Sequence, residues 1–361
     1  MILFFSPYPQ DIKATKTGLF QRVLAIDSLF SNKKRIYIAV SYSKNFFKSE
    51  KVINENLKVY NLNAMIHFFF ILKLILNAKF IYSHTIANAL KYLPYSIFFK
   101  KKRFVCDMHG ITPEEYTMIG SGFKSFLFNI IEYFVLKLVD KIICVTNSMG
   151  NHYRLKYPQT NINTIILPIF SINVDYDLNY NSHYKINKKF INIIYAGGTQ
   201  VWQNFNQMLE LSMKMTKQKY HFEFWIPDNS LVLYQVDKKY TEIIFKTGTN
   251  KEVISAYSDF DLGFVLRDDT AVNNVACPTK IVEYIQNGVV PILKSNKIGD
   301  FIELGMKYFL IEELITKEVK QDIIEKYKIN NLKVYELFNK RINDGKEKLV
   351  KFTEINYKEK T

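Results

Sequence analysis

Short apolar runs alternate with longer amphipathic runs along most of this chain. The runs that predict strands are 1–5, 35–41, 57–61, 79–83, 103–106, 141–145, 163–167, 190–196, 221–226, 243–247, 261–266 and 289–293. Those that predict helices are 17–31, 64–77, 85–99, 123–139, 146–155, 203–217, 250–258 and 278–287. This alternation is typical of parallel sheets whose strands are joined by crossover helices, so it predicts an α/β fold.

Length and one polar stretch predict two domains. The 361 residues suit two domains of about 150 residues each. Residues 171–189 are rich in Asn, Asp, Tyr and Ser without a sustained period, which is typical of a linker. We therefore expect an N-terminal domain over 1–170 and a C-terminal domain over 190–315. The charged segment 316–361 has a helical pattern, and we expect it to pack back on the first domain.

The net charge of +15 predicts attraction to polyanions, such as nucleic acid, anionic lipid or phosphate-bearing substrates. Three cysteines, Cys106, Cys144 and Cys277, show no paired spacing, so they indicate neither a disulfide framework nor a zinc site. A reducing compartment suits such cysteines. The N-terminus has no basic region before its short apolar run, so a buried first strand is expected there rather than a signal peptide. These features favour a cytoplasmic protein.

One segment of the first half has the composition of a membrane-touching surface. The longest apolar stretch, 62–76, is shorter than the roughly 18 residues needed to cross a bilayer. Between His67 and Phe104, aromatic side chains stand beside lysines, including the run 100–102. Helices of this composition lie on membrane surfaces. The segment predicts peripheral attachment to anionic lipid at the inner face of the membrane, and the alternative is buried helix faces with a coding bias towards Lys, Phe and Tyr.

Polar residues follow several predicted strands at the point where each strand ends. Asp107 and His109 come after 103–106, the pair Gly197-Gly198 after 190–196, and Arg267 after 261–266. Ligands of open α/β sheets bind at the carboxyl ends of the strands. We therefore expect each half to contribute polar groups to a ligand cleft between them.

The stretch 275–288 predicts a loop and a short helix, with Pro278 in the first turn and Gly288 just past the end. Thr279, Lys280 and Glu283 share one face of that helix because they are three and four residues apart. Free N–H groups and dipole charge at a helix N-terminus suit a diphosphate. A Glu one turn later suits sugar hydroxyls. The alternative is an ordinary surface pair of Lys and Glu.

Each of the other polar groups also has a structural alternative. The imidazole of His109 suits acid–base chemistry near neutral pH, or it is an exposed His in a turn. The guanidinium of Arg267 matches phosphate oxygens, or it pairs with the neighbouring Asp268. Gly197 and Gly198 let a ligand approach the backbone closely, or they form a tight turn.

No metal and no cofactor are expected. The sequence contains neither the dinucleotide fingerprint nor the Walker pattern. Asp259-Phe-Asp261 has the spacing of a metal-binding Asp-x-Asp motif, but it precedes a predicted strand and so lies at the wrong end of a parallel sheet. No second carboxylate cluster supports Mg²⁺ or Mn²⁺ there.

These motifs together resemble retaining sugar transferases of the GT-B fold, those of glycosyltransferase family four, and among them cell-surface polysaccharide transferases. The match rests on the Gly-Gly turn and on Pro278-Thr-Lys280-x-x-Glu283-Tyr before Gly288. The resemblance implies two Rossmann-like domains with parallel sheets facing a central cleft. It also implies that Pro278, Thr279 and Lys280 hold the donor diphosphate and that Glu283 binds the ribose.

Three further segments carry the resemblance. Asp107-x-His109-Gly110 is similar to the first-half loop that faces the donor sugar, and Thr17-Gly18 to a degenerate Gly-rich loop. Gly197 and Gly198 with Gln200 are similar to a subset of the polysaccharide transferases. The family's usual Arg and Lys after this strand are absent, and its second Glu, eight positions before Glu283, is Val275. Arg267 is expected to supply the missing cation.

The resemblance thus implies a metal-independent, retaining glycosyltransferase of the hexosyl type. It would move a sugar from a nucleoside diphosphate sugar to a hydroxyl of a lipid-linked glycan, in lipopolysaccharide or capsule synthesis. The expected catalytic residues are Asp107, His109, Arg267 and Lys280. Alternatives are a non-catalytic glycan- or membrane-binding protein on the same scaffold and a nucleotide-sugar epimerase. Nucleic acid is not an expected partner, because the chain has no recognisable module for it.

Overall fold

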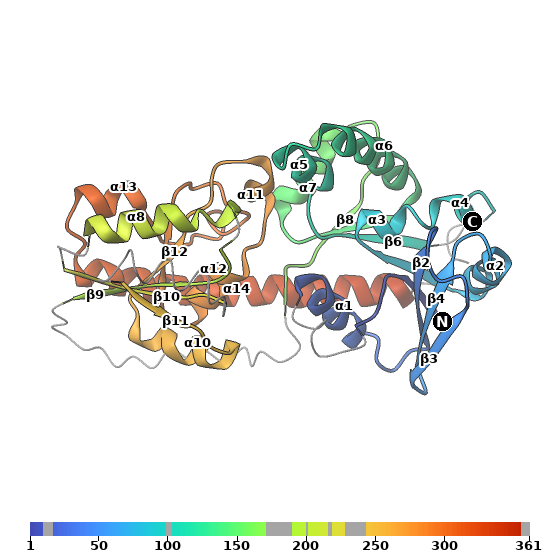
Figure 1. Cartoon of the computed structure of the whole chain (residues 1–361), viewed down its shortest axis with the longest axis horizontal. Helices are drawn as coiled ribbons and strands as arrows, with labels where there is room; N and C mark the ends of the chain where they lie inside the picture. The colour runs from blue at the N-terminus through green and yellow to red at the C-terminus, as the bar shows by residue number, and fades with distance from the viewer. Residues whose placement is uncertain are drawn as a thin grey trace. The chain divides into compact units, whose positions relative to one another are not determined.

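The computed structural model describes residues 1–9, 17–98, 103–170, 190–199, 201–215, 219–227 and 243–354. The chain forms two compact units (Figure 1). One comprises Met1–Val174 with Arg341–Thr361, and the other Asp175–Lys340. The predicted linker 171–189 lies outside the described residues.

The first unit contains an eight-stranded sheet in the order β3-β4-β2-β1-β5-β6-β7-β8. Its strands are β1 (Ile2–Phe5), β2 (Arg35–Ser41), β3 (Ser49–Asn54), β4 (Leu57–Asn63), β5 (Phe80–His84), β6 (Arg103–Met108), β7 (Lys141–Cys144) and β8 (Thr164–Ile166). Every neighbouring pair is parallel except the hairpin of β3 and β4. The central strands β1, β5 and β6 are buried along their whole length, as expected of apolar strands covered on both faces.

Seven helices belong to this unit within the described residues. They are α1 (Gly18–Ser28), α2 (Phe68–Asn77), α3 (Ile86–Ala89), α4 (Leu93–Ser96), α5 (Thr112–Met118), α6 (Gly122–Leu138) and α7 (Asn147–Lys156). Thr146 caps α7, because its hydroxyl accepts a hydrogen bond from the backbone N–H of Met149 at 3.0 Å. The single helix predicted over 85–99 is wrong. Two short helices stand there, and the second has a proline in its first turn, where proline is tolerated.

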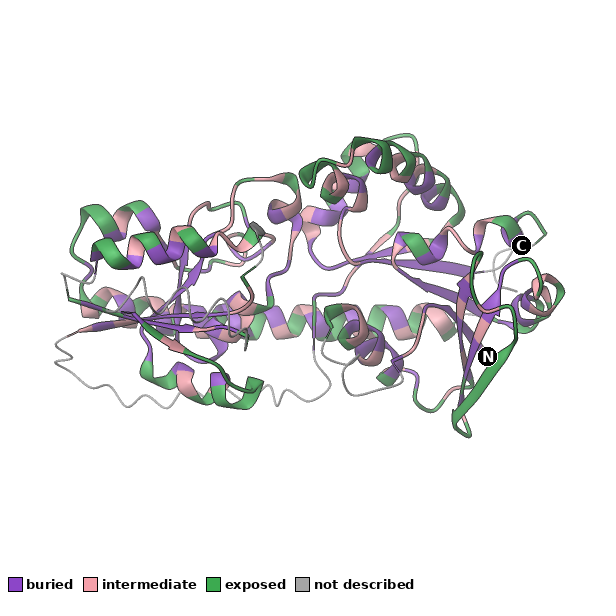
Figure 2. Cartoon of the chain, in the orientation of Figure 1, coloured by how far each residue is buried: buried purple, intermediate pink, exposed green. Residues whose placement is uncertain are grey.

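The second unit contains a six-stranded parallel sheet in the order β11-β10-β9-β12-β13-β14. The strands are β9 (Ile191–Ala196), β10 (Tyr220–Trp225), β11 (Ile244–Lys246), β12 (Leu262–Val265), β13 (Val290–Leu293) and β14 (Phe309–Leu310). The helical elements are η2 (Val201–Gln203), α8 (Phe205–Met215), α10 (Asn250–Ala256), η3 (Tyr257–Asp259), α11 (Ala271–Val275), α12 (Thr279–Gln286), α13 (Ile311–Thr316) and the first part of α14 (Gln321–Glu354). Buried strands form the core of each unit, and exposed residues lie on the outer helix faces (Figure 2).

Helix α14 begins in the second unit and ends in the first (Figure 1). Its last turns pack on the first unit. A Cβ added at Gly345 would lie 2.4 Å from the carbonyl oxygen of Ile166, so the helix backbone touches β8 directly. The ring of Phe352 packs against Phe80, with centroids 6.0 Å apart. The C-terminal half of α14 is therefore part of the first unit's fold.

The predicted α/β fold class is confirmed: strands and helices alternate, and both sheets are parallel apart from one hairpin. In parallel sheets the carboxyl ends of adjacent strands meet at one edge. Asp107 and His109 lie at that edge in the first unit, and Gly197 and Arg267 at that edge in the second.

Candidate functional site

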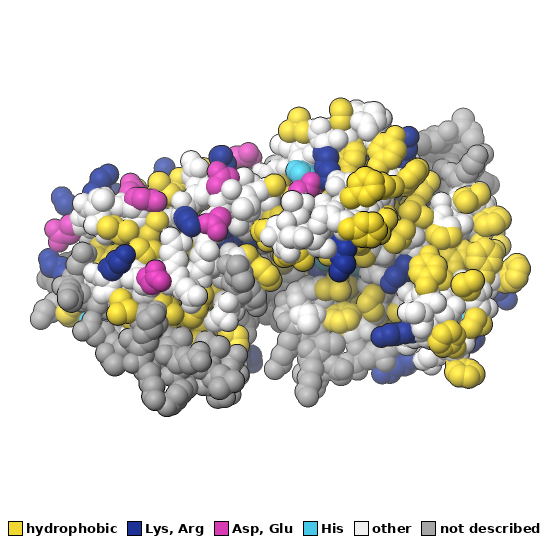
Figure 3. Space-filling view, turned by 45° about the horizontal axis from the view of Figure 1, so that its top comes forward, with side chains coloured by type: hydrophobic (Ala, Val, Ile, Leu, Met, Phe, Trp, Pro, Cys, Tyr) yellow, Lys and Arg dark blue, Asp and Glu magenta, His cyan; other side chains and the backbone are white. Residues whose placement is uncertain are grey.

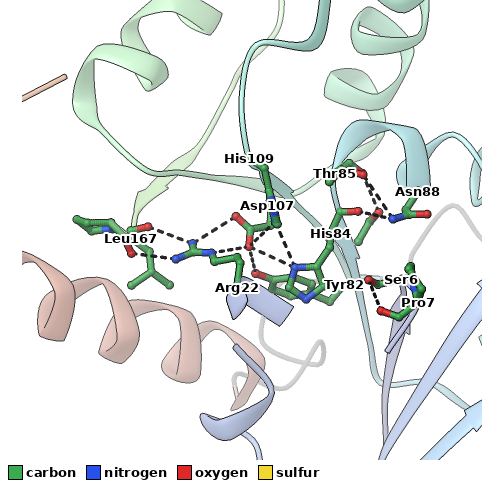
Figure 4. Close-up of polar contacts among 12 residues, drawn as sticks. Ser6, Pro7, Arg22, Tyr82, His84, Thr85, Asn88, Asp107, His109 and Leu167 are labelled. Atoms are coloured by element: carbon green, nitrogen blue, oxygen red, sulfur yellow. Dashed lines mark hydrogen bonds and ion pairs between the residues drawn. The ribbon is translucent and has the colours of Figure 1, made fainter. Parts of the chain in front are cut away.

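Asp107, near the end of β6, is the centre of a buried polar cluster in the first unit (Figure 4). Arg22 of α1 binds its carboxylate at two points, with Nε 3.0 Å from Oδ2 and Nη2 3.3 Å from Oδ1. The hydroxyl of Tyr82 donates to Oδ2 at 2.8 Å. Arg22 also donates to the backbone carbonyls of Leu167 and Pro168. Helix α1 and strands β5 and β6 are thereby joined at one carboxylate.

The charge of this cluster is fixed by its surroundings. Burial alone would raise the pKa of Asp107, but the adjacent charge of Arg22 and the contacts with His109 and His84 hold it well below its usual value. The carboxylate is fully buried, so solvent does not reach it. Asp107 is therefore an ionised anchor for its neighbours rather than a group that meets a ligand.

Two histidines lie against this anchor. His84 Nδ1 and His109 Nε2 are each 3.5 Å from Oδ2 of Asp107, and 3.4 Å from each other. His84 is completely buried, and burial lowers its pKa to about 4, so it is neutral near pH 7. His109 keeps a fifth of its side chain exposed. Of the three groups, only His109 is accessible to a ligand.

These three residues are also the one group among the described residues with metal-ligand spacing, since their ligand atoms lie within 4.8 Å of one another. Both carboxylate oxygens of Asp107 already accept hydrogen bonds from Arg22, whose charge opposes a bound cation.

In the second unit, Asp261 begins the segment that leads into β12. It accepts from the backbone N–H of Asn192 at 3.0 Å and lies 3.3 Å from Lys328. These partners give Asp261 a structural role at the amino end of the sheet.

Glu114 and Glu115, which follow His109 in the sequence, have different surroundings. Glu114 pairs with Lys156 at 2.7 Å and with His152 at 3.3 Å, and these bonds lower its pKa to about 2 despite desolvation. Glu115 lies over Gly110, where an added Cβ would come 1.9 Å from its Oε1. Desolvation and the charge of Glu114 raise the pKa of Glu115. Gly110 therefore leaves the space that Glu115 occupies beside His109.

The Gly197-Gly198 turn follows β9 in the second unit. The N–H of Gly197 donates to the carbonyl of Trp225 at 3.0 Å, which extends the sheet pairing by one residue. A Cβ on Gly197 would lie 2.8 Å from the hydroxyl oxygen of Tyr195, and that hydroxyl donates to the carbonyl of Gly198. Both glycines are partly exposed. Gln200 lies outside the described residues.

Arg267 follows β12 at the same edge of this sheet. Its Nε is buried and has no hydrogen-bond partner among the residues that the structure describes. Burial lowers its pKa, while Tyr195 and Cys277 act in the opposite direction. The predicted alternative, an ion pair with Asp268, is not formed. Asp268 binds Lys294, and Asp269 binds Lys297 at 2.8 Å. Arg267 is thus a largely buried cation close to the residue that precedes Pro278.

Helix α12 begins after Pro278, as the sequence predicted, and exposes Thr279 in its first turn. Lys280 Nζ lies 2.7 Å from Oε2 of Glu283, and the hydroxyl of Tyr257 donates to the same oxygen at 2.9 Å. The predicted surface Lys–Glu pair therefore exists. Both side chains keep about a quarter of their surface exposed.

Gly18 is the first residue of α1 and follows Thr17, which caps the helix through a hydrogen bond from the N–H of Phe20. No described atom lies within 4 Å of the place where a Cβ on Gly18 would stand. The described residues therefore impose no steric need for glycine at this position.

Comparison with solved structures identifies the architecture. No protein-family model and no curated protein sequence matches the chain. A structure of OtsA without ligand aligns with 98% of this chain and 99% of its own, with a TM-score of 0.67 and 11% identity. The chain has the GT-B fold.

Two further structures are similar. An α,α-trehalose-phosphate synthase (UDP-forming) from Burkholderia vietnamiensis covers 98% of this chain and 96% of its own, with a TM-score of 0.66 and 9% identity. A sucrose-phosphate synthase from Thermosynechococcus elongatus covers 95% and 93%, with a TM-score of 0.57 and 9% identity. At these identities the likeness concerns the GT-B fold, and activity has to be argued from the site residues.

Proposed function

We propose that this protein is a glycosyltransferase that moves a sugar from a nucleoside diphosphate sugar to a hydroxyl group. The observation that carries the proposal is Arg267, a largely buried cation at the carboxyl edge of the second sheet whose Nε has no hydrogen-bond partner among the described residues. A buried charge without a counterion favours binding of an anion. The guanidinium of Arg267 matches a diphosphate oxygen pair in geometry.

The groups around Arg267 suit the rest of such a donor. Helix α12 begins at Thr279, two residues after Cys277, and offers the partial positive charge of its N-terminus. Lys280 and Glu283 are partly exposed, so a ligand can bind both side chains in place of the contact between them. In this proposal Lys280 and Thr279 bind the diphosphate, and Glu283 accepts hydrogen bonds from the ribose. The backbone of Gly197 and Gly198 is partly exposed, so the ligand can approach it closely.

Catalysis in this proposal is electrostatic. Arg267 and Lys280 stabilise the negative charge that develops on the departing diphosphate, and a single well-placed donor contributes about 3–4 kcal/mol. His109 acts at the transferring sugar, and Asp107 holds its imidazole in place. Because these cations supply the positive charge, no metal is required. Activity that is lost in EDTA and restored by Mn²⁺ would contradict this part.

The similar structures support a nucleotide-sugar donor. One structure, of trehalose-6-phosphate from E. coli, is bound with UDP-2-fluoro glucose. A structure of trehalose-6-phosphate synthase concerns enzymatic glycosyl transfer with retention. We extend retention to this chain, in keeping with its resemblance to family four. For the acceptor we propose a lipid-linked glycan in cell-surface polysaccharide synthesis, used by an enzyme that attaches to the inner membrane face. The alternative acceptor is a soluble sugar phosphate.

A turnover assay tests the proposal. The purified protein is incubated with a mixture of UDP-, GDP-, dTDP- and CMP-sugars, with and without lipid extract, and released nucleotide is measured. We expect release from one donor that increases with the lipid extract. Nucleotide binding without release in any mixture would favour a non-catalytic protein on this scaffold. Conversion of the sugar without an acceptor would favour an epimerase.

A further inference from the structure

Helix α6 exposes a continuous apolar stripe to solvent. Six of its side chains are between 41% and 79% exposed, and we name them the α6 stripe: Phe123, Phe126, Leu127, Ile130, Phe134 and Leu138. Apart from the adjacent Phe126 and Leu127, they are three or four residues apart, so they cover roughly a third of the helix circumference. A surface helix normally places polar residues on this side. The α6 stripe therefore requires an explanation other than packing within the unit.

The opposite side of α6 already satisfies the core of the first unit. Ile131, Val135 and Leu136 are buried, and so is Glu132, which binds Lys156 at 2.7 Å. Figure 2 shows the outward side of α6 as exposed. The helix is thus apolar on both sides, with one side buried in the fold and the other left uncovered by the residues that the structure describes.

A second apolar group lies on neighbouring elements of the same unit. Its exposed members, which we name the α2–α4 ridge, are Met65, Ile66, Phe69, Leu76, Ile97 and Phe98. The rings of Phe68 and Phe98 are 6.2 Å apart, which joins α2 to the end of α4. Helix α3, just before α4, packs against α6. Figure 3 shows hydrophobic side chains gathered over the first unit, with Lys and Arg side chains among them.

Most charged residues around both groups are basic, although the exposed Asp140 lies two positions after Leu138. Neither 56–106 nor 116–131 contains an acidic residue. The ammonium of Lys124 lies 5.6 Å from the ring centre of Tyr116, and that of Lys137 lies 4.4 Å from the ring centre of Tyr133. Both lysines are exposed. Lysines and tyrosines therefore flank the apolar side chains of α6, and no acidic side chain in these two segments would repel an anionic surface.

We propose that the α6 stripe, with the α2–α4 ridge beside it, inserts into the headgroup region of an anionic phospholipid bilayer. Amphipathic surfaces that bind membranes in this way combine Phe and Leu with Lys. The exposed lysines beside the α6 stripe complement the negative charge of anionic headgroups, and this complementarity favours lipid as the occupant. Among the described residues no helix is long and apolar enough to cross a bilayer, so α6 would lie along the surface.

This inference rests on the proposed function for its biological purpose, which is access to a lipid-linked acceptor. It does not depend on that function for its test, because vesicle binding needs neither donor nor acceptor. It extends the sequence-based expectation, which placed the membrane contact between His67 and Phe104, by adding helix α6 to the part of that segment that forms the α2–α4 ridge. Lys100, Lys101 and Lys102 of that expectation lie outside the described residues.

The test is co-sedimentation of the full chain with two kinds of vesicle: phosphatidylcholine alone, and phosphatidylcholine with an equal part of phosphatidylglycerol. We expect binding to the anionic vesicles that weakens as salt rises. The double variant Phe126→Gln/Phe134→Gln should bind at least about tenfold more weakly, because it removes two inserted rings. Lys124→Gln/Lys137→Gln should lose about fivefold per lysine on anionic vesicles.

A matched control is Ile329→Gln/Leu337→Gln, which replaces two half-exposed apolar side chains of α14 in the second unit. It should bind vesicles like the parent. Equal vesicle binding by the parent and the Phe126/Phe134 variant, or no binding by the parent, would overturn the proposal. A parent that is dimeric in sedimentation velocity, and monomeric when Phe126 and Phe134 are replaced, would assign the α6 stripe to a second copy instead. Nucleotide titration of the same variants shows whether the donor site is intact. A failure of membrane binding can therefore be told apart from a failure of the proposed function.

Discussion

Arg22 and Asp107 form a fully buried ion pair closed by two hydrogen bonds, at 3.0 and 3.3 Å. The pair joins helix α1 to strand β6, although 85 positions separate the residues in sequence. Because Arg22 fixes the carboxylate of Asp107, that carboxylate can hold the imidazole of His109, whose Nε2 lies 3.5 Å from Oδ2 of Asp107. We therefore assign Asp107 to positioning His109, and we keep His109 as the group that reaches a ligand.

Replacing Arg22 with Ala should destabilise the first unit by about 3–5 kcal/mol, because Asp107 would remain as a buried charge without a counterion. Chemical denaturation of the full chain measures this. Lys33→Ala is the matched control, since Lys33 pairs with Glu354 at 2.9 Å on the surface. It should cost less than about 1 kcal/mol. Equal costs for the two variants would show that the buried pair contributes no more than a surface pair.

Much of the fold could be predicted because the strands of parallel sheets are short, apolar runs. The strands of the first half were predicted to within two residues at most ends, apart from β3. Strand β3 was missed because all six of its residues are exposed and the run is mostly polar. Helix α5 was missed because it is short and has a proline in its first turn. Local pattern says little about an exposed edge strand or a helix of two turns.

The site was predictable only in part. Asp107 and His109 follow the strand predicted over 103–106, so their place at the carboxyl edge of the sheet could be predicted from the sequence. The contacts of Arg22 and Tyr82 with Asp107 did not follow. Arg22 lies within a predicted helix between Gln21 and Val23, where the pattern is that of any surface arginine, and its partner is set by tertiary packing. Likewise, no local signal shows that Asp268 pairs with Lys294 and leaves Arg267 apart.

Stability should fall as the pH drops from about 6.5 to 4, because of His84. Burial lowers the pKa of His84 to about 4 from a usual value of 6.5, so the unfolded chain takes up this proton first. The free energy of unfolding is therefore unaffected by His84 above pH 6.5, and it is lower by about 3 kcal/mol at pH 4. The pKa of Asp107 is also lowered in the fold. Its contribution to stability is lost only below about pH 4, where the same carboxyl of the unfolded chain takes up a proton. Burial raises the pKa of Tyr82, so its hydroxyl stays protonated throughout this range.

Denaturation of the parent and of His84→Phe at several pH values measures this effect. Phe is suitable because His84 already packs against the rings of Phe4 and Tyr82. The variant should show a flatter stability profile between pH 6.5 and 4. An unchanged slope would mean that another group takes up the proton.

Substitution of His109 by Ala should reduce turnover by about 10²–10⁴-fold, as expected for loss of a general acid or base. Nucleotide affinity should be retained, because the donor diphosphate is assigned to the second unit. His221→Ala is the control, since His221 is an exposed residue of β10. Turnover by His109→Ala at the parent rate would remove His109 from the mechanism.

Glu283→Ala should weaken nucleoside diphosphate binding by about 1.5–3 kcal/mol, through loss of charge-assisted bonds to the ribose. The loss of its partly exposed contact with Lys280 should cost the fold about 0.5 kcal/mol, and the loss of its hydrogen bond from the buried Tyr257 about 1 kcal/mol more. Titration calorimetry and thermal unfolding measure the two effects separately. Glu312→Ala, at an exposed position in the first turn of α13, should change neither. Parent-like affinity in Glu283→Ala would leave Glu283 as a structural partner of Tyr257 and Lys280.

The central claim is that Arg267 holds the diphosphate of a nucleotide-sugar donor. Calorimetric titration with UDP, GDP, dTDP and CDP tests it most directly, on the parent, on Arg267→Gln and on Lys297→Gln. Lys297 is the control because it is an exposed cation of the same unit, paired with Asp269. We predict that one diphosphate binds the parent and Lys297→Gln equally, and binds Arg267→Gln about ten- to a hundredfold more weakly. Parent-like binding by Arg267→Gln, or no binding of any diphosphate to the parent, would contradict the claim.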